Sequence, residues 1–305
     1  MTELVRTIIP EDLPKVAGLL KEVFNDPHYE SISRLGGMTN HSYKVTRSDG
    51  KVYLARIPGE GTEEMINRKD ERKSTELACR LGIDSELLYF GDDGRKVMCF
   101  IEEPQPMNVE VMQEDEIIRQ VAEIFAKLHH CGVDTGVPFN VFEMAATYER
   151  IIMDAGVALY DDYEQVKGKV MAIKTAMDAK FPPTRVPCHN DSLVGNWVLD
   201  KHGRLWLIDW EYSGMNEAMW DLSCTSIECE YTEVHDEMLL NRYFGRPFTV
   251  DEKKQFVASK MYVDYLWTLW GLTRIPFDGQ FMQGYADTRY SRLKANIAAY
   301  EKIGG

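Results

Sequence analysis

The chain has 305 residues, 44% of them hydrophobic, and its formal net charge is −14. Such a composition is typical of a globular protein with a sizeable core, and the length predicts about two domains. The acidic balance argues against nucleic acid as a partner, because binding to phosphate groups needs a basic surface.

No stretch of the sequence approaches the ~20 consecutive apolar residues that a membrane span needs. Residues 1–15 show no basic-then-apolar signal pattern. The six cysteines are scattered, with no C-x-x-C pair, which is typical of reduced thiols. We therefore expect a cytoplasmic protein without membrane insertion. We expect no zinc site at His129 and His130, because they lack cysteines at finger spacing.

Within the first hundred residues, hydrophobic periodicity and turn signals predict a small antiparallel sheet accompanied by helices. The expected order is an amphipathic helix, three strands, a second helix that ends at Gly82, and a hairpin. These elements fall at residues 10–24, 30–59, 63–82 and 87–104. Pro104 and Pro106 mark a joint, and we place the first domain at residues 1–102.

The second domain is predicted at residues 103–305 and is mainly helical. Helical periodicity covers residues 114–132, 141–157 and 161–180. The segment FPPTRVP interrupts it, a hairpin follows, and from about residue 215 the chain is again helical and rich in aromatic residues. The fold class is therefore α+β, with a small β-rich lobe and a larger helical lobe. Such an architecture usually binds its ligand between the lobes.

An acidic residue ends an apolar strand in the segment NWVLDKHGRLWLID (196–209). The pattern predicts a hairpin with its turn at Asp200–Gly203. Folding about that turn pairs Asn196 with Asp209, with their Cβ atoms ~5 Å apart. An amide oxygen and a carboxylate at that spacing suit a hard cation such as Mg²⁺, which would also stabilise the otherwise unfavourable charge of Asp209.

Asp191 precedes Asn196 in the string H-x-D-x-x-x-x-N, and Asp209 follows 13 residues after Asn196. In protein kinases, the Asp of such a string accepts the hydroxyl proton, while the Asn and a later Asp hold metal ions. Each acidic residue alone is more often a turn cap, but the complete string favours phosphoryl transfer. Asp191, Asn196 and Asp209 are therefore the candidate catalytic residues, the last two as metal ligands.

The first domain should then supply contacts to phosphate. Glycines in GGMTN (36–40) would let backbone N–H groups approach phosphate, although most Gly-Gly pairs are simply turns. Arg56 lies on the apolar face of a predicted strand. A cation at such a position needs a nearby anion. That anion would be the ATP phosphates or a glutamate on a helix. Glu71 is the first choice for the glutamate and Glu76 is the second. A surface arginine on an edge strand is the alternative.

In several segments the sequence resembles the choline/ethanolamine kinases, in particular the bacterial choline kinases. The resemblance spans about residues 30–295. The matching segments are LGGMTN (35–40), LARIPG (54–59), NRKDE (67–71), HNDSLVGN (189–196), LIDWEYSG (207–214) and YLWTLWGLTR (265–274). The H-x-D-x-x-x-x-N string is shared with the wider aminoglycoside-phosphotransferase-like superfamily, whereas GGMTN, IDWEYSG and the double-tryptophan segment are more specific.

The resemblance implies a bilobal protein-kinase-like fold, ATP and Mg²⁺ as cofactors, and Asp191 as the base for the choline hydroxyl. Arg56 stands where protein kinases have lysine, as is usual in this family, so the details of phosphate contact are left open. The segment MCFI occupies the hinge position that meets adenine. The residues implied to contact the nucleotide are Gly36, Gly37, Met38, Thr39, Asn40, Arg56, Glu71, Met98, Phe100 and Ile101.

Choline is a quaternary ammonium without hydrogen-bond donors on nitrogen, and aromatic faces and carboxylates hold such cations. Trp267 and Trp270 share a helix face by their spacing. Spacing alone favours core packing for such a pair, whereas the resemblance favours a pocket. Asp221 is expected to hydrogen-bond the catalytic loop or to cap a helix. The residues implied to contact choline are Asp191, Glu211, Tyr212, Trp267, Trp270, Phe281 and Tyr285.

The sequence thus favours an ATP:choline phosphotransferase that acts on a small molecule. The same chemistry on ethanolamine, thiamine or an aminoglycoside stays open, although paired tryptophans suit a methylated ammonium. A catalytically inactive quaternary-amine-binding protein is the further alternative. Loss of Asp191, Asn196 or Asp209 would have favoured it, and all three are present. The oligomeric state is left open, with a homodimer as one option.

Overall fold

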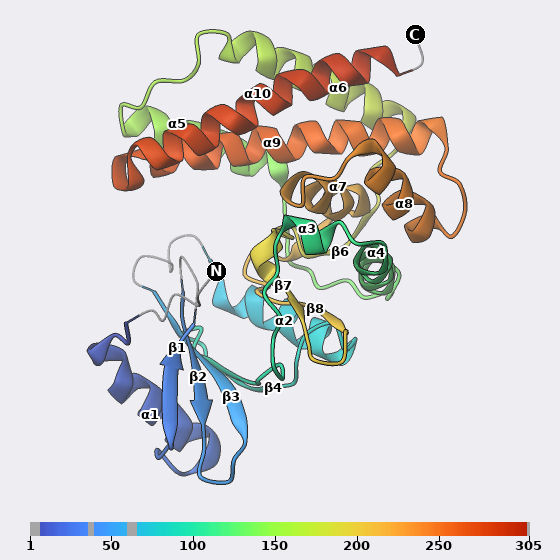
Figure 1. Ribbon diagram of the computed structural model, residues 1–305. Coiled ribbons are helices and arrows are strands. Elements are labelled where there is room, and N and C mark those ends of the chain that lie inside the picture. The colour runs from blue at the N-terminus through green and yellow to red at the C-terminus, as the bar shows by residue number, and fades with distance from the viewer. Residues whose placement is uncertain (1–6, 36–39, 60–65, 304–305) are drawn as a thin grey trace. The chain divides into compact units, whose positions relative to one another are not determined.

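The computed structural model describes residues 7–35, 40–59 and 66–303, which divide into two compact units (Figure 1). The sheet unit comprises residues 1–107 and 195–213, and the helical unit comprises residues 108–194 and 214–305. The first border between the units, after residue 107, lies close to the joint predicted from the prolines. Residues 195–213 depart from the predicted second domain, because their contacts are with the sheet unit: for example, Leu207 N–H donates to the Ile83 carbonyl at 3.1 Å.

The sheet unit contains a five-stranded antiparallel sheet in the order β1-β2-β3-β5-β4. This arrangement confirms the three strands predicted between residues 30 and 59 and the hairpin predicted after them. The strands are β1 (Ser31–Arg34), β2 (Asn40–Thr46), β3 (Val52–Pro58), β4 (Leu87–Phe90) and β5 (Lys96–Cys99).

Helix α1 (Leu13–Phe24) follows a 3-10 turn at Pro10–Asp12 and packs against the sheet, as the amphipathic pattern predicts. Leu19 and Leu20 of α1 are fully buried in the same core as Ala55 of β3. Burial of side chains of this size contributes about 1.5–3 kcal/mol each. Because side chains alternate along a strand, Arg56 points to the opposite face of the sheet.

Helix α2 (Arg68–Arg80) is shorter than the predicted helix over 63–82. Residues 63–65 lie outside the described part of the chain, and Asn67 caps the helix because its Oδ1 accepts a hydrogen bond from Lys69 N–H at 3.1 Å. The predicted end is confirmed: Gly82 has a φ of 61°, the left-handed conformation that favours glycine after a helix.

The predicted hairpin forms, as β7 (Trp197–Leu199) and β8 (Leu205–Leu207), but its predicted register is wrong by one residue. Leu199 faces Leu205, and Asp200 N–H donates to the Arg204 carbonyl at 3.0 Å, so the loop holds the three residues 201–203 and not the four of the predicted pairing. Gly203 supplies the left-handed residue, with a φ of 76°, that a three-residue hairpin loop needs. Asn196 therefore lies opposite Ile208 and not Asp209, since the Asn196 carbonyl accepts from Ile208 N–H at 2.9 Å.

The helical unit confirms the predicted helices near residues 114–132, 141–157 and 161–180. Its helices are α3 (Val109–Met112), α4 (Asp115–His129), α5 (Val141–Asp154), α6 (Tyr163–Lys180), α7 (Ala218–Glu228), α8 (Glu233–Phe244), α9 (Val250–Asp278) and α10 (Gln280–Lys302). The long helices α9 and α10 lie side by side (Figure 1), and the chain reverses between them at Gly279. Within the described part of the chain, no helix combines the length and apolar character that crossing a membrane requires.

The short ribbon formed by β6 (Arg185–Cys188) and β9 (Gly214–Glu217) was not predicted. Each strand has four residues, and the first falls in the segment that the proline pattern marks as a break. Cys188 pairs with Gly214, so the partner strand begins 26 residues later (214 − 188). A local pattern of residues carries little information about a pairing between such short and distant segments.

Candidate functional site

A buried ion pair lies on the sheet face that bears Arg56. Arg56 Nη1 is 2.5 Å from Glu71 Oε1, and the two side chains are 3% and 0% exposed. Arg56 Nη2 also donates to the Gly94 carbonyl at 2.9 Å. The predicted pairing of Arg56 with Glu71 is therefore confirmed. Glu76 pairs instead with Arg72 on the exposed side of α2, at 2.8 Å.

Lys96 is a second buried cation of this network and was missed in the sequence. It is the cross-strand neighbour of Arg56, and its Nζ lies 3.5 Å from Glu71 Oε1. Burial alone would oppose ionisation of Glu71, but Lys96, Arg56 and Arg68 together lower its pKa to about 2. The reasoning that singled out Arg56 applies equally to Lys96, because Lys96 begins the apolar strand KVMC.

A cavity of about 190 Å³ opens beside the network and is lined by residues of the sheet unit alone. Lys96 and Asp84 line it, and burial raises the pKa of Asp84 to about 6, although Lys96 opposes that rise. The cavity also brings together five of the residues predicted to hold nucleotide or metal, namely Arg56, Met98, Phe100, Ile101 and Asp209. It thus combines apolar walls, two cations and carboxylates.

Asp209 has an unusual environment at the end of β8. Its φ of 68° is rare for a residue with a side chain, and such strain is often found at functional sites. Its Oδ1 is buried and accepts no hydrogen bond from the described residues, and Arg56 Nη1 is 3.8 Å away. Asn196 lies at the same end of the hairpin, opposite Ile208. A buried carboxylate oxygen without a hydrogen-bond donor among the described residues fits the oxygen ligands that Mg²⁺ takes.

The predicted phosphate loop is described only at its end. Gly36, Gly37, Met38 and Thr39 lie outside the described residues. Asn40 begins β2, and its Nδ2 donates to Glu211 Oε2 at 2.8 Å. Arg68 Nη1 lies 3.5 Å from the same oxygen. Burial, followed by the nearby charge of Asp209, raises the pKa of Glu211.

In the helical unit, the loop after β6 carries Asp191 and is held by α7. Asp221 accepts hydrogen bonds from the backbone N–H groups of His189 and Asn190, both at 2.8 Å. Trp220 Nε1 donates to the carbonyl of Asn190, whose φ is 69°. The expectation that Asp221 bonds the backbone of this loop is therefore confirmed.

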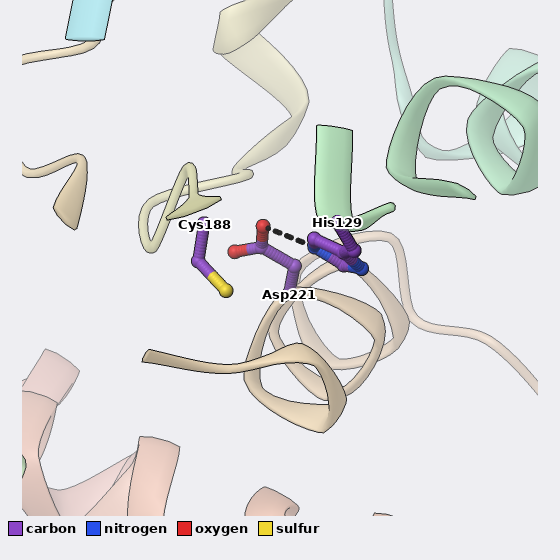
Figure 2. A group of neighbouring side chains, drawn as sticks. All are labelled: His129, Cys188 and Asp221. Atoms are coloured by element: carbon purple, nitrogen blue, oxygen red, sulfur yellow. Dashed lines mark hydrogen bonds and ion pairs between the residues drawn. The ribbon is translucent and has the colours of Figure 1, made fainter. Parts of the chain in front are cut away.

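Figure 2 shows that Asp221 also meets a buried histidine, His129 of α4, beside Cys188. His129 Nε2 lies 3.1 Å from Asp221 Oδ2, and its Nδ1 lies 3.0 Å from the Tyr243 hydroxyl. Because a carboxylate only accepts, Nε2 carries a proton and donates it to Asp221. The side chains of His129, Cys188 and Asp221 have ligand atoms within 4.8 Å of one another. Burial raises the pKa of Cys188 well above its usual value, so this group suits a hydrogen-bonded support better than a metal site.

If the H-x-D-x-x-x-x-N string performs the phosphoryl transfer expected from the sequence, Asp221→Asn should lower kcat by about 10–100-fold while the KM for nucleotide changes little. One side-chain oxygen becomes an NH₂ group that faces backbone or histidine donors, and an unsatisfied buried donor costs about 1–3 kcal/mol. Steady-state kinetics measure kcat and KM, and urea unfolding measures the loss of stability caused by the unsatisfied donor. Asp154→Asn, on the exposed end of α5, is the matched control. A loss of stability with full kcat would limit Asp221 to a structural role.

Three aromatic side chains predicted to hold choline come together in the helical unit. The ring centroids of Trp267 and Trp270 are 5.9 Å apart at 88°, and those of Trp270 and Tyr285 are 5.8 Å apart at 71°. Gly271 permits this packing, because an added Cβ would lie 2.9 Å from the Tyr285 ring. Burial raises the pKa of Tyr285, and nearby Glu228 and Asp191 add to the rise although Arg289 opposes it.

Other predicted choline contacts are placed differently. Phe281 lies at the start of α10 and is 74% exposed. Glu211 and Tyr212 belong to the sheet unit, whereas Asp191 belongs to the helical unit. Arg289 is buried, pairs with Glu228, and stacks its guanidinium 4.5 Å from the Tyr285 ring centroid.

Comparison with known proteins agrees with this architecture. A crystal structure of a choline/ethanolamine kinase family protein from Mesorhizobium loti matches with a TM-score of 0.81 and 30% identity, covering 94% of this chain and 98% of that one. The crystal structure of choline kinase LicA from Streptococcus pneumoniae matches with a TM-score of 0.77 and 29% identity, covering 94% and 99%. Protein LicA of Haemophilus influenzae is 25% identical over 93% of this chain and 84% of its own length.

The fold is therefore the α+β protein-kinase-like fold that the sequence predicted. The family model for choline/ethanolamine kinases matches residues 32–265. The chain belongs to the choline/ethanolamine kinase family, a family of small-molecule kinases.

Proposed function

We propose that this protein transfers the γ-phosphoryl group of ATP to the hydroxyl of choline, giving phosphocholine and ADP. The family supports a kinase of choline or ethanolamine. The observation that carries phosphoryl transfer is the cavity of the sheet unit, where Arg56 and Lys96 lie beside Asp209, whose buried Oδ1 has no hydrogen-bond donor among the described residues. Phosphates with a divalent cation would complement this arrangement of charge.

The nucleotide would bind in this cavity, with its adenine against Met98, Phe100 and Ile101. The backbone N–H of Ile101 makes no hydrogen bond within the described part of the chain, so it is available to an adenine acceptor. Residues 36–39 remain proposed phosphate contacts. Glu71 keeps Arg56 and Lys96 oriented, because both cations are buried and share its carboxylate.

Asn196 and Asp209 would hold Mg²⁺, which supplies charge neutralisation for the phosphate groups. The donor set fits, because Asp209 Oδ1 lacks a hydrogen bond from the described residues. Asp191 would accept the proton of the substrate hydroxyl. Its loop is suited to that role, because Asp221 and Trp220 fix the preceding backbone and restrict where the carboxylate can reach.

Choline is the favoured alcohol because of Trp267, Trp270 and Tyr285. Each aromatic face against a quaternary ammonium contributes about 1–2 kcal/mol once the cation is desolvated. A primary ammonium such as that of ethanolamine needs hydrogen-bond acceptors, and the nearby Glu228 carboxylate is already paired with Arg289. Glu211 and Tyr212 remain proposed contacts, whereas the 74% exposure of Phe281 argues against its contribution.

A coupled assay of ADP release tests both the reaction and the substrate. The protein is supplied with Mg-ATP and with choline, ethanolamine, thiamine or kanamycin at matched concentrations. We expect release with choline that stops when Mg²⁺ is chelated. Release with ethanolamine alone would keep the reaction and refute the aromatic argument, and release with none of the four would refute the proposed function.

Trp267→Ala is expected to raise the KM for choline by about 10-fold or more and to leave the KM for ATP nearly unchanged. The cause is the loss of one aromatic face from the ammonium site. Because Trp267 is only 4% exposed, truncation also weakens the core. Trp267→Phe keeps a ring and should recover most of the affinity. Equal increases in both KM values would identify Trp267 as a core residue only.

A further inference from the structure

A second cavity, of about 120 Å³, lies wholly within the helical unit and has no residue in common with the nucleotide cavity or with the Trp267–Tyr285 aromatic group. Engineered cavities of about 150 Å³ admit a benzene molecule, so a small organic molecule fits here. The side chains that matter for its chemistry are Phe139, Phe142, Trp220 and Tyr262, with Asn216 and Glu217.

Two polar groups of this cavity lack partners. The Tyr262 hydroxyl is buried and makes no hydrogen bond to the described residues. The Glu217 carboxylate forms no ion pair within the described part of the chain, although Lys174 and Arg185 line the same cavity. Lys174 is paired with Asp178. The Tyr262 hydroxyl is withdrawn from water and Glu217 is half-buried. An unpaired buried polar group is costly, so a ligand that donates to the hydroxyl while it pairs with the carboxylate gains free energy.

The pKa shifts of Glu217 and Tyr262 agree with this geometry. Burial raises the pKa of Glu217, and Lys174 only partly opposes the rise. Burial, followed by the charges of Glu217 and Asp178, raises the pKa of Tyr262, so the two unpaired groups influence each other. Phe142 and Tyr262 stand edge to face, with ring centroids 5.5 Å apart.

We propose that this cavity binds a small organic ammonium ion that bears N–H donors. The ammonium would donate to Glu217 and to the Tyr262 oxygen, and its hydrocarbon part would pack on Phe139, Phe142 and Trp220. Aromatic faces beside a carboxylate favour an organic cation over a neutral or anionic molecule of the same size. The two unpaired acceptors select a primary ammonium over a quaternary one, which has no N–H group.

The same cavity is connected directly to the loop that carries Asp191. Asn216 Nδ2 donates to Asn190 Oδ1 at 2.9 Å, and Trp220 Nε1 donates to the Asn190 carbonyl at 2.9 Å. Glu217 N–H in turn donates to Asn216 Oδ1 at 2.8 Å. A ligand held by Glu217 and Trp220 therefore acts on the residue next to Asp191. Through these contacts, occupancy would change kcat, an effect that rests on the proposed function.

Calorimetric titration without ATP tests the binding. Butylammonium is the probe, with 1-butanol as its neutral counterpart, and choline is kept in excess to occupy an ammonium site elsewhere. We expect butylammonium to bind with a Kd of about 1 mM or tighter, and butanol at least about 10-fold more weakly. Glu217→Gln and Tyr262→Phe should each weaken butylammonium binding by about 10-fold. Glu164→Gln, exposed on α6, should not.

Equal affinity for butanol, or unchanged binding in Glu217→Gln and Tyr262→Phe, would overturn the proposal. The kinetic arm measures kcat with saturating ATP and choline as butylammonium is added. We expect kcat to change in the wild type and to stay constant in Glu217→Gln. Binding with a constant kcat in both proteins would overturn the link to the Asp191 loop. Failure of turnover in every protein would concern the proposed function alone, since binding is measured without it.

Discussion

Asp191→Asn is expected to lower kcat by about 10²–10⁴-fold, the usual contribution of a general base. Asparagine has nearly the same shape as aspartate but cannot accept the hydroxyl proton. The affinity for nucleotide should change little, because the cavity proposed to bind it is lined by residues of the sheet unit and Asp191 belongs to the helical unit. Single-turnover kinetics and nucleotide titration measure the two quantities separately.

Asp154→Asn is the control for Asp191→Asn, because it makes the same chemical change at an exposed position of the same unit. It should retain wild-type kcat. Far-UV circular dichroism checks that both variants fold. Turnover by Asp191→Asn close to that of the wild type would remove Asp191 from the role of base.

Glu71→Gln is expected to reduce the free energy of unfolding by about 3–5 kcal/mol at pH 7, because it leaves Arg56 and Lys96 buried without their anion. The effect should depend on pH. The folded pKa of Glu71 is about 2, below the ordinary value of 4.5. Its ionisation therefore stabilises the fold fully above pH 4.5, and this stabilisation of about 3 kcal/mol is lost as the pH falls from 4.5 to 2.

Urea unfolding of wild type and Glu71→Gln between pH 7 and pH 2 measures this dependence. The difference in stability should narrow as the pH falls through that range. Glu76→Gln is the matched control, because Glu76 is on the same helix and pairs with Arg72 at the surface. Exposed pairs of this spacing contribute about 0.3–0.5 kcal/mol. A pH-independent difference for Glu71→Gln would show that the ion pairs are not the source of its effect.

The sequence predicted the ion pair of the candidate site because both partners follow strong local patterns. Arg56 lies on an apolar strand face, and Glu71 lies in the first turn of a helix with clear boundaries. Lys96 was missed although it obeys the same rule. Its pairing with Arg56 depends on the order β3-β5, which places strands that are distant in the chain next to each other.

The relative position of the candidate metal ligands could not be predicted from the sequence, for a different reason. The string of Asp191, Asn196 and Asp209 indicated the chemistry, but the position of Asn196 relative to Asp209 depended on the hairpin register. One residue more or less in a loop reverses the face of every side chain beyond it. Gly203 in the left-handed conformation set that loop length, and a glycine in a turn does not by itself reveal which turn it will form.

The discontinuity of the sheet unit has a consequence for synthesis of the protein on the ribosome. One wall of the proposed nucleotide cavity contains Val198, Ile208 and Asp209. It belongs to residues 195–213, far beyond the end of the sheet at Cys99. The nascent chain would need several seconds, at about 5–20 residues per second, to add it. Throughout that interval Arg56, Lys96 and the apolar cavity wall would be exposed, so we expect nascent chains that end before residue 195 to depend most on chaperones.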